Sequence, residues 1–169
     1  MSGYVLAKYI RLSAEDFDTG EKDKEESNSV VNQRELLNDF ISRTPDFIGC
    51  EVLEFCDDGW SGTNFNRPRV QEVLKLAENG KIHCIVVKDL SRFGRNHIEV
   101  GDYLEQKLPE WGVRFIAVND AFDSELYRGS TGGIDIAFRN LIYDLYSRDL
   151  SEKVRSSRIT QAQKGKFFS

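Results

Sequence analysis

The sequence has few of the residues that bind metals or form disulfides. Its 169 residues include three cysteines and two histidines, and no two cysteines have C-x-x-C spacing. This pattern does not predict a zinc site. We interpret Cys50, Cys56 and Cys84 as free thiols in a reducing compartment.

Long hydrophobic runs are absent as well. No stretch approaches the roughly 20 apolar residues that a membrane-spanning helix needs. The apolar segment 4–10 is short, contains Lys8, and lacks a basic leader and a small-residue cleavage site, so it is more typical of a first strand than of a signal peptide. With 40% hydrophobic and 30% charged residues, we expect one globular domain in the cytoplasm without membrane contact.

Motifs of several common enzyme classes are missing. The chain contains neither a G-x-x-x-x-G-K-[ST] nor a G-x-G-x-x-G segment. His83 and His97 have no obvious carboxylate partner, so no Ser-His-Asp set is expected. Nucleotide-driven and nicotinamide-dependent enzymes are therefore disfavoured.

The net charge of −5 is unevenly distributed. Residues 15–26 hold seven acidic and two basic residues, and their net charge of −5 equals that of the whole chain. Residues 148–169 hold six basic and two acidic residues. A basic arm of this kind is typical of a contact with a polyanion, although the chain as a whole is acidic.

Segments with strand character alternate with segments of helical spacing. The expected strands cover residues 3–12, 50–56, 82–87 and 113–118, and the expected helices cover residues 29–43, 68–78 and 98–108. The acidic residues 14–28 are expected to form a solvated loop, with Ser29 as the N-cap of the first helix. This alternation predicts an α/β domain with a mostly parallel central sheet of about four strands.

The last part of the chain has a different pattern. From Ile134 there is no proline and no glycine until Gly165, which predicts a helix much longer than average. We therefore divide the chain into an α/β core of residues 1–133 and a long C-terminal helix of residues 134–169. A helix that outruns the domain is expected to protrude, to carry a partner, or both.

Polar segments follow the first three predicted strands. Ser13 lies just past the first strand, and the loops 57–67 and 88–96 follow the second and third strands. Because the carboxyl ends of parallel strands meet at one edge of a sheet, we expect these segments to face one crevice.

These segments bring one hydroxyl together with four arginines. Arg11 and Ser13 are two apart and share a face of the strand end. Arg67, Arg92 and Arg95 lie in the other two loops. Attack on a phosphodiester builds negative charge on its oxygens, which planar guanidiniums match, so the set favours phosphoryl transfer. Taken singly, each arginine could instead form a surface ion pair or a solvated face.

Four motifs in register resemble the serine recombinases of the resolvase and invertase family. They are Y-I-R-L-S at residues 9–13, N-S-V-V-N-Q at 28–33, D-G-W-S-G followed by N-R-P within 58–68, and S-R-F-G-R-N at 91–96. The resemblance covers nearly the whole chain and implies the resolvase-like three-layer α/β fold. The longer acidic insert after Ser13 is similar to the large, transposon-type branch of the family.

The resemblance also implies a mechanism. Ser13 would attack DNA to form a 5'-phosphoserine bond, Arg11, Arg67, Arg92 and Arg95 would hold the scissile phosphate, and Tyr9, Gln33 and Asp58 would support them. No metal and no other cofactor would be needed. The partner would be double-stranded DNA, and homodimers would pair as a tetramer to cut and rejoin the ends of a mobile element, by excision or integration.

Several features of the C-terminal half bear on this resemblance. The family usually has an acid where this chain has Ser91, and its Glu-Arg pair on the long helix stands here as Glu152-Lys153. The first part of that helix is apolar enough to pack on a partner subunit, on its own sheet, or on both. Its basic end is expected to lie along the DNA backbone through Lys153, Arg155, Arg158, Lys164 and Lys166. The chain stops at Ser169, where relatives continue, so we expect a part of a longer protein that binds DNA poorly by itself.

Two other interpretations stay open. A phosphatase or nuclease could use the same arginines. A non-catalytic, flavodoxin-like signalling or dimerisation module could instead use Asp57 or Asp58 as an acceptor carboxylate, but the arginines would then lack a purpose.

Overall fold

The computed structural model describes residues 3–12, 22–59 and 62–127, with 142–144, 146–147, 155 and 158–159, and of residues 22–28 it describes only the backbone. In chain order, the elements are β1 (Val5–Leu12), α1 (Lys22–Arg43), the 3-10 turn η2 (Pro45–Phe47), β2 (Glu51–Asp58), α2 (Pro68–Glu78), β3 (Cys84–Val87), α3 (Leu90–Phe93), α4 (His97–Asp102), the π-helical turn η3 (Tyr103–Lys107), α5 (Leu108–Glu110), β4 (Arg114–Ala117), β5 (Phe122–Asp123) and the 3-10 turn η4 (Ser124–Tyr127).

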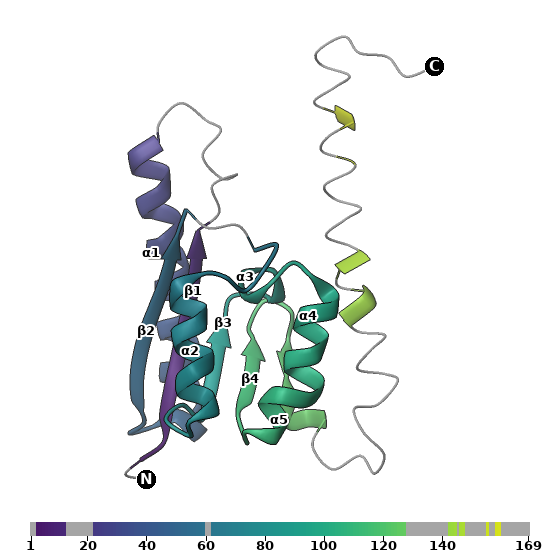
Figure 1. Cartoon of the computed structure of the whole chain (residues 1–169). Coiled ribbons are helices and arrows are strands. Elements are labelled where there is room, and N and C mark those ends of the chain that lie inside the picture. The colour runs from purple at the N-terminus through teal and green to yellow at the C-terminus, as the bar shows by residue number, and fades with distance from the viewer. Residues whose placement is uncertain are drawn as a thin grey trace.

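The strands form a five-stranded sheet in the order β2-β1-β3-β4-β5. The first four strands are parallel, and β5 runs antiparallel to β4 (Figure 1). The predicted α/β fold with a mostly parallel sheet is therefore confirmed. The fifth strand was not predicted, because it consists of only two residues in a segment whose composition is that of a loop.

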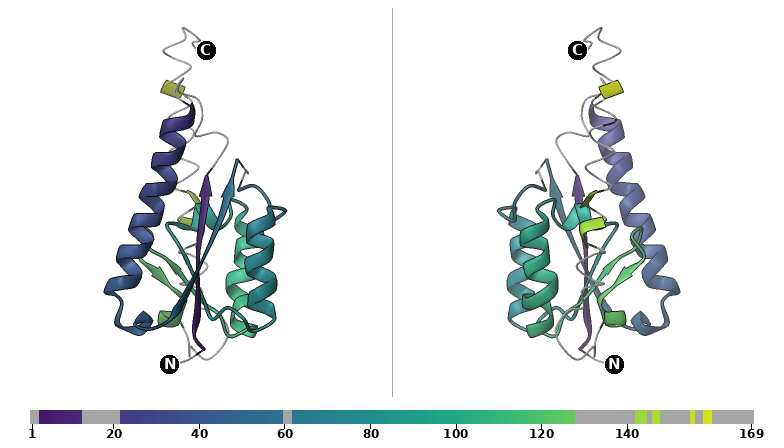
Figure 2. Two further views of the ribbon diagram at one scale, coloured as in Figure 1. Left: turned by 90° about the vertical axis from the view of Figure 1, so that its left-hand side faces the viewer. Right: turned by 90° about the vertical axis from the view of Figure 1, so that its right-hand side faces the viewer.

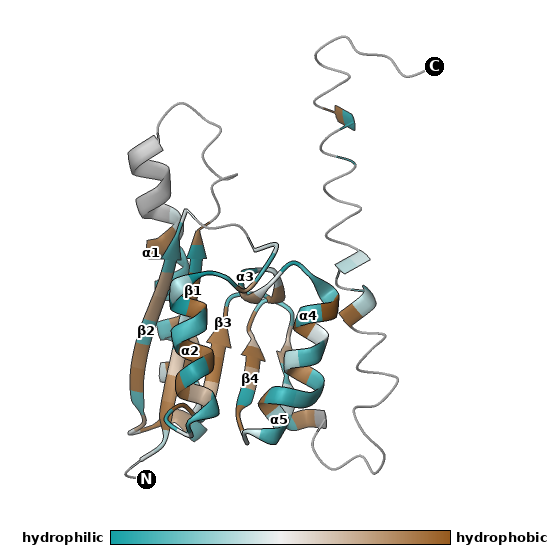
Figure 3. Ribbon diagram, in the orientation of Figure 1, coloured by the Kyte–Doolittle hydropathy of each residue, from teal (hydrophilic) through white to brown (hydrophobic). Residues whose placement is uncertain are grey.

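Helices cover both faces of the sheet, as the two side views in Figure 2 show. On one face, Leu37 and Ile41 of α1 pack with Leu6 and Ile10 of β1. On the other face, α2 and the α4–α5 stretch cover alternate residues of the same strands, among them Ala7 and Tyr9 of β1 with Ile85 and Val87 of β3. Successive side chains of a strand point to opposite faces, so the apolar strands feed two cores. Figure 3 shows the corresponding hydrophobic strands beside helices that alternate between polar and hydrophobic residues.

The first helix begins earlier than predicted. Helix α1 starts at Lys22, seven residues before Ser29, so part of the expected loop 14–28 is helical. The segment K-D-K-E-E-S-N has no apolar stripe, which is why it was interpreted as a loop. Lysine and glutamate nevertheless have high helix propensity, and a helix already anchored on the sheet by its later turns can extend through them.

The predicted helix at residues 98–108 is longer and is divided into three parts. It begins at His97, where the Asn96 side chain accepts hydrogen bonds from the amides of Ile98 and Glu99. Tyr103–Lys107 forms the π-helical turn, and Pro109 lies inside the last short helix instead of ending it. Proline is tolerated there because the first turn of a helix leaves its amides unbonded.

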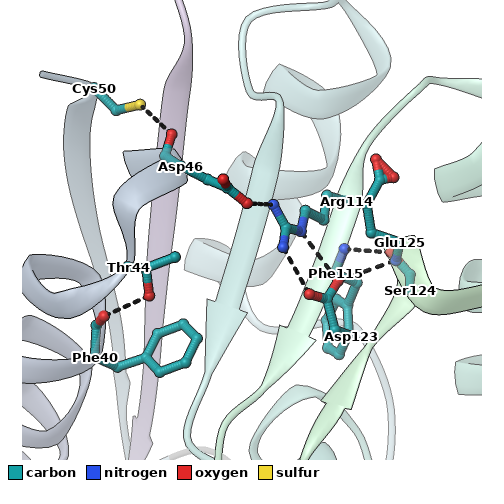
Figure 4. Close-up of polar contacts among 9 residues, drawn as sticks. All are labelled: Phe40, Thr44, Asp46, Cys50, Arg114, Phe115, Asp123, Ser124 and Glu125. Atoms are coloured by element: carbon teal, nitrogen blue, oxygen red, sulfur yellow. Dashed lines mark hydrogen bonds and ion pairs between the residues drawn. The ribbon is translucent and has the colours of Figure 1, made fainter. Parts of the chain in front are cut away.

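A set of ion pairs around Arg114, which we call the Arg114 bracket, closes the edge of the sheet where the parallel strands begin. Arg114 at the start of β4 donates two hydrogen bonds to the Asp123 carboxylate, at 3.0 and 2.7 Å, and one to Asp46 at 3.0 Å (Figure 4). The side chain of Ser124 accepts from the Phe115 amide at 2.8 Å. These contacts tie the short β5 and the turn η2 to β4, which explains why a two-residue strand is retained.

The long C-terminal helix stays a prediction. The described residues of that stretch are helical, and the rest of 134–169 lies outside the described residues. Ile142 is 4% exposed and packs with Tyr146 on the core that α2 and α4 cover. Among the helices that the structure describes, none is both long enough and apolar enough to cross a membrane.

Candidate active site

The end of β1 meets the loops that follow β2 and β3 at one edge of the sheet, as predicted for these two loops, whereas Ser13 lies outside the described residues. β1 ends at Leu12, and the connection after β3 places α3 above this edge (Figure 1). The Arg11 side chain donates to the Ser91 carbonyl at 2.8 Å, and the Arg95 amide donates to the Gly62 carbonyl at 2.7 Å. The ends of β1, β2 and β3 are thus bound to one another at this edge.

Two of the four predicted arginines are fully buried beneath α3. Arg11 and Arg67 both have 0% exposed surface. Arg11 donates to the carbonyls of Ser91 and Arg92, and Arg67 donates to those of Arg92 and Phe93. The last carbonyls of a helix lack partners within the helix, so these guanidiniums complete the C-terminus of α3 while placing positive charge under it.

The other two arginines are half-buried and lie beside the first pair. Arg92 donates from Nη1 to the Arg11 carbonyl at 3.0 Å. A Cβ atom added at Gly62 would lie 3.0 Å from both Arg11 Cζ and Arg95 Cγ. A side chain at Gly62 would therefore push these two arginines apart. The structure brings Arg11, Arg67, Arg92 and Arg95 together, and we call these four residues the arginine cluster.

The electrostatics of the arginine cluster favour an anion. Burial, together with the charges of Arg95, Arg92 and Arg67, lowers the pKa of Arg11 to about 10. Burial also lowers the pKa of Arg67. Crowded, desolvated cations of this kind gain from a phosphate or another anion that neutralises them.

A buried tyrosine and a carboxylate support the arginine cluster from β1 and β2. The Tyr9 hydroxyl donates to Asp57 Oδ2 at 2.8 Å and accepts from Arg67 Nη1 at 2.5 Å. Asp57 also accepts from the amides of Arg69 and Val70, so it caps the start of α2. Burial raises the pKa of Tyr9, which keeps its hydroxyl protonated as a donor.

The structure corrects the choice between two adjacent aspartates. Asp58 was predicted to support the arginines, but it is exposed, whereas Asp57 is 1% exposed and makes the contacts. Asp57 is paired with Arg11 in the β1–β2 ladder, so both point to the α2 face. Asp58 is paired with Leu12 and belongs to the opposite face.

Gln33, which the resemblance implied as a supporting residue, lies close to the end of β1. It is 1% exposed on α1, and its amide donates to the Arg11 carbonyl at 3.3 Å. The same carbonyl accepts from Arg92. Gln33 therefore reaches the arginine cluster from the other face of the sheet.

The side chain of Ser91 is bonded to a carboxylate at the start of α3. Its hydroxyl donates to Asp89 Oδ1 at 2.5 Å, and the same oxygen accepts from the Arg92 amide at 3.1 Å. Asp120 accepts from the Leu90 amide at 2.7 Å, and burial raises the pKa of its carboxyl. Two carboxylates therefore hold the start of α3, which fixes the direction of the helix that carries Arg92.

Some of the predicted residues lie outside the described residues. They are Ser13, Lys153, Lys164 and Lys166. Arg155 and Arg158 are described as exposed, helical residues. Within the described part of the chain, no group of three or more His, Cys, Asp or Glu side chains is arranged to hold a metal ion.

Nearly the whole chain, including the site, matches one known protein family. The model of the family described as "Resolvase, N terminal domain" matches residues 6–167. The chain belongs to the resolvase family. This membership confirms the resemblance that the four motifs indicated.

Relatives of the resolvase domain are found among curated proteins. A putative DNA recombinase of Bacillus subtilis (strain 168) is 25% identical over 118 residues. That match covers 68% of this resolvase domain and 22% of the relative. The chain thus spans about a fifth of the length of the curated relative that it matches.

Solved structures share the fold of the resolvase domain. The N-terminal catalytic domain of TP901-1 integrase has a TM-score of 0.60 at 21% identity, over 86% of this chain and 98% of that one. A resolvase family site-specific recombinase from Streptococcus pneumoniae has a TM-score of 0.55 at 22% identity, over 95% of this chain and 99% of that one. At such identities the likeness establishes the fold.

Three residues were not predicted to support the arginine cluster: Asp57, Asp120 and Tyr146, whose hydroxyl donates to the Gly94 carbonyl at 2.8 Å. The signal for Asp57 was present in the D-D pair, but choosing between the two requires the register of β2 against β1. The contacts of Asp120 and Tyr146 join segments distant in sequence, so no local pattern reveals them.

Proposed function

We propose that this chain is the catalytic domain of a serine site-specific DNA recombinase, in which Ser13 attacks a DNA phosphate held by arginines. The observation that carries the proposal is the arginine cluster at the edge where β1 ends, one residue before Ser13. Membership of the resolvase family and the name of the curated relative support the same function.

The proposed step exchanges one phosphate ester for another. The Ser13 oxygen forms a bond to phosphorus, and the bond from phosphorus to the 3'-oxygen of the DNA breaks. The serine loses its hydroxyl proton, and the departing 3'-oxygen gains one. The product is a 5'-phosphoserine link and a free 3'-hydroxyl, and attack by a 3'-hydroxyl reverses the step. Because the ester bond is conserved, neither ATP nor a metal is needed.

The burial of the four arginines suggests a division of their roles. Arg92 and Arg95 are half-buried and contact the phosphate oxygens, where their planar groups match the charge that develops in the transition state. Arg11 and Arg67 already donate to carbonyls of α3, so they build the site and add to its positive field. Tyr9, Gln33 and Asp57 hold these groups in place.

The proposed partner is double-stranded DNA, bound by a homodimer. Residues 1–133 form the catalytic core, and residues 134–169 form the helix that contacts the second subunit and the DNA backbone. Arg155 and Arg158 are exposed, as a phosphate contact requires. Two dimers pair as a tetramer, cut all four strands, rotate by half a turn and rejoin them, which excises or integrates a mobile element.

A flavodoxin-like signalling role is less well supported. The strand order β2-β1-β3-β4-β5 is shared with flavodoxin-like folds, whose ligands bind at the same edge. A signalling domain needs an accessible acceptor carboxylate, but Asp57 is buried and accepts from Tyr9 and from two amides of α2. Asp58 is exposed, but a signalling role for it leaves the arginine cluster without a purpose.

An adduct assay tests the proposed function. The full-length protein is incubated with DNA fragments from the region that flanks its gene, denatured, and probed for DNA bound to protein. We expect a covalent adduct with wild-type protein, none with Ser13→Ala, and no effect of a chelator. An equal adduct from Ser13→Ala would show that another residue is the nucleophile. Free DNA ends that disappear with chelator would indicate a metal-dependent nuclease.

A further inference from the structure

The carbonyl oxygens of four consecutive residues, 91–94, all accept hydrogen bonds from side chains. Arg11 and Arg67 donate to the first three. The fourth, that of Gly94, accepts from the Tyr146 hydroxyl at 2.8 Å. The backbone that carries Arg92 and Arg95 is therefore held by two core arginines and by one neutral group from the C-terminal stretch.

The position of Gly94 is tightly restricted. It is buried, and an added Cβ atom would lie 2.7 Å from Val100 Cγ2 and 2.9 Å from Phe65 Cζ. The next residue, Arg95, donates its amide to the Gly62 carbonyl at 2.7 Å. The Gly94 carbonyl and the Arg95 amide belong to one planar peptide group, so a displacement of that carbonyl also moves the amide of Arg95.

Tyr146 contacts both ends of the link between α3 and α4. Besides its bond to Gly94, its ring lies 5.9 Å from that of His97, the first residue of α4. Tyr143, one turn earlier, contacts the same histidine at 5.7 Å but is 60% exposed. Among the described residues, nothing accepts a hydrogen bond from the Tyr143 hydroxyl. The Tyr146 hydroxyl thus has a bond to Gly94 that the Tyr143 hydroxyl lacks, and the Tyr146 side chain is also packed on the core.

We propose that Tyr146 is a positioning residue for the arginine cluster. Its hydroxyl fixes the Gly94 carbonyl and thereby the placement of Arg92 and Arg95, which couples the C-terminal stretch to the site. A change in the position of Tyr146 on binding DNA or a partner is therefore transmitted to Arg92 and Arg95. This inference rests on the proposed function for its effect on cleavage, but the coupling itself is measurable without DNA.

Hydrogen exchange tests the coupling in the free, full-length protein. In Tyr146→Phe, we expect the Arg95 amide to exchange at least about fivefold faster than in wild type, since a neutral hydrogen bond has been removed from its neighbour. Tyr143→Phe loses a hydroxyl from the same stretch and serves as the matched control, with unchanged exchange. Equal exchange in the two variants, or a uniform increase over the whole chain, overturns the proposal.

Cleavage kinetics test the consequence for the reaction. With saturating DNA, we expect Tyr146→Phe to form the covalent adduct about fivefold to tenfold more slowly than wild type, while the dissociation constant for DNA changes less than twofold. Tyr143→Phe should retain the wild-type rate. A loss confined to DNA affinity contradicts a positioning role.

The two proposals fail in different ways. If wild-type protein forms no adduct but Tyr146→Phe still exchanges faster at Arg95, the proposed function is wrong and the coupling stands. If wild type forms the adduct and Tyr146→Phe matches it in both rate and exchange, the proposed function stands and Tyr146 has no positioning role.

Discussion

Arginines of one cluster differ in what their side chains do. Arg11 and Arg67 are fully buried and bonded to carbonyls of α3, whereas Arg92 and Arg95 are half-buried at the same edge. Buried arginines bonded to the backbone stabilise both the fold and the site. Substituting one of them would therefore not distinguish an effect on the reaction from an effect on stability. The half-buried pair offers a cleaner test of chemistry.

Arg95→Ala should abolish most of the activity without unfolding the protein. We expect the rate of adduct formation to fall by at least about 100-fold, as for the loss of a group that stabilises transition-state charge. Arg95→Lys should also be slow, because a point charge lacks the planar fork. The free energy of unfolding in urea should fall by less than about 1 kcal/mol. Arg95 is one of the cations that lower the pKa of Arg11, so its removal relieves a repulsion between like charges in the folded state.

An arginine outside the cluster provides the control for that substitution. Arg69 is exposed and forms a surface ion pair with Glu72 at 2.7 Å. Arg69→Ala should keep the wild-type rate, because surface pairs contribute little. If Arg95→Ala unfolds the protein, or cleaves as fast as Arg69→Ala, the assigned role of Arg95 is wrong.

The two aspartates at the end of β2 should differ sharply in their effect on stability. Asp57→Ala removes the acceptor for Tyr9 and for two amides at the start of α2, and leaves buried donors unpaired. We expect the free energy of unfolding to fall by about 2–4 kcal/mol. The exposed Asp58→Ala should change it by less than about 0.5 kcal/mol. Urea denaturation measures both, and equal losses would contradict the assignment of Asp57.

At the scale of elements, an ion cluster joins α1 to the sheet. Lys8 of β1 lies 2.8 Å from the Glu54 carboxylate of β2 and donates to Asn38 of α1 at 2.6 Å. Arg34 of α1 donates to the same carboxylate at 2.7–3.0 Å. This cluster fastens the helix that carries Gln33 against the two strands that carry the site.

The ion cluster should make the stability depend on pH in the acid range. Hydrogen bonds from Arg34 and Lys8, acting against burial, lower the pKa of Glu54 from 4.5 to about 2. The folded state therefore favours the charged carboxylate, and this stabilisation is complete above pH 4.5 and is lost as the pH falls towards 2. Urea unfolding between pH 2 and 6 should show a smaller loss of stability in Glu54→Gln than in wild type. Identical slopes would contradict the role of Glu54.

Elements with strong periodicity were predictable from the sequence. The continuous apolar run at 82–87 marked β3, whose four residues are fully buried, and Pro68 and Asn79 marked the ends of α2. The family motifs at the strand ends were sufficient to locate all four arginines of the cluster. Local pattern and tertiary packing agree in these segments, so the pattern alone was informative.

Elements that depend on distant contacts were not predictable. The two-residue β5 exists because Arg114 binds Asp123 and Asp46 from separate segments. The π-helical turn at Tyr103–Lys107 leaves no mark in the apolar spacing. The roles of Asp57 and Tyr146 follow from register and from packing across the chain. Such contacts are set by the whole fold, which a window of neighbouring residues does not contain.

At the scale of the whole molecule, the two ends of the sheet carry different groups of charged residues. The edge where the parallel strands begin is closed by the Arg114 bracket, and the edge where they end holds the arginine cluster. The chain carries a net charge of −5, so the positive site is a local feature of an acidic protein. Ile142 and Tyr146 place their part of the proposed DNA-binding helix beside that site. In the proposed function, DNA held by this helix lies close to the edge of the sheet that holds the arginine cluster.

The most direct test of this account is to find which protein atom carries the DNA. Trypsin cleavage after Arg11 and Lys22 releases residues 12–22, in which Ser13 and Thr19 bear the hydroxyl groups. After nuclease trimming of the adduct, tandem mass spectrometry of this peptide should locate a nucleotide on Ser13, joined through its 5'-phosphate. A nucleotide on Thr19 or on another peptide, or a link through a 3'-phosphate, would contradict the account.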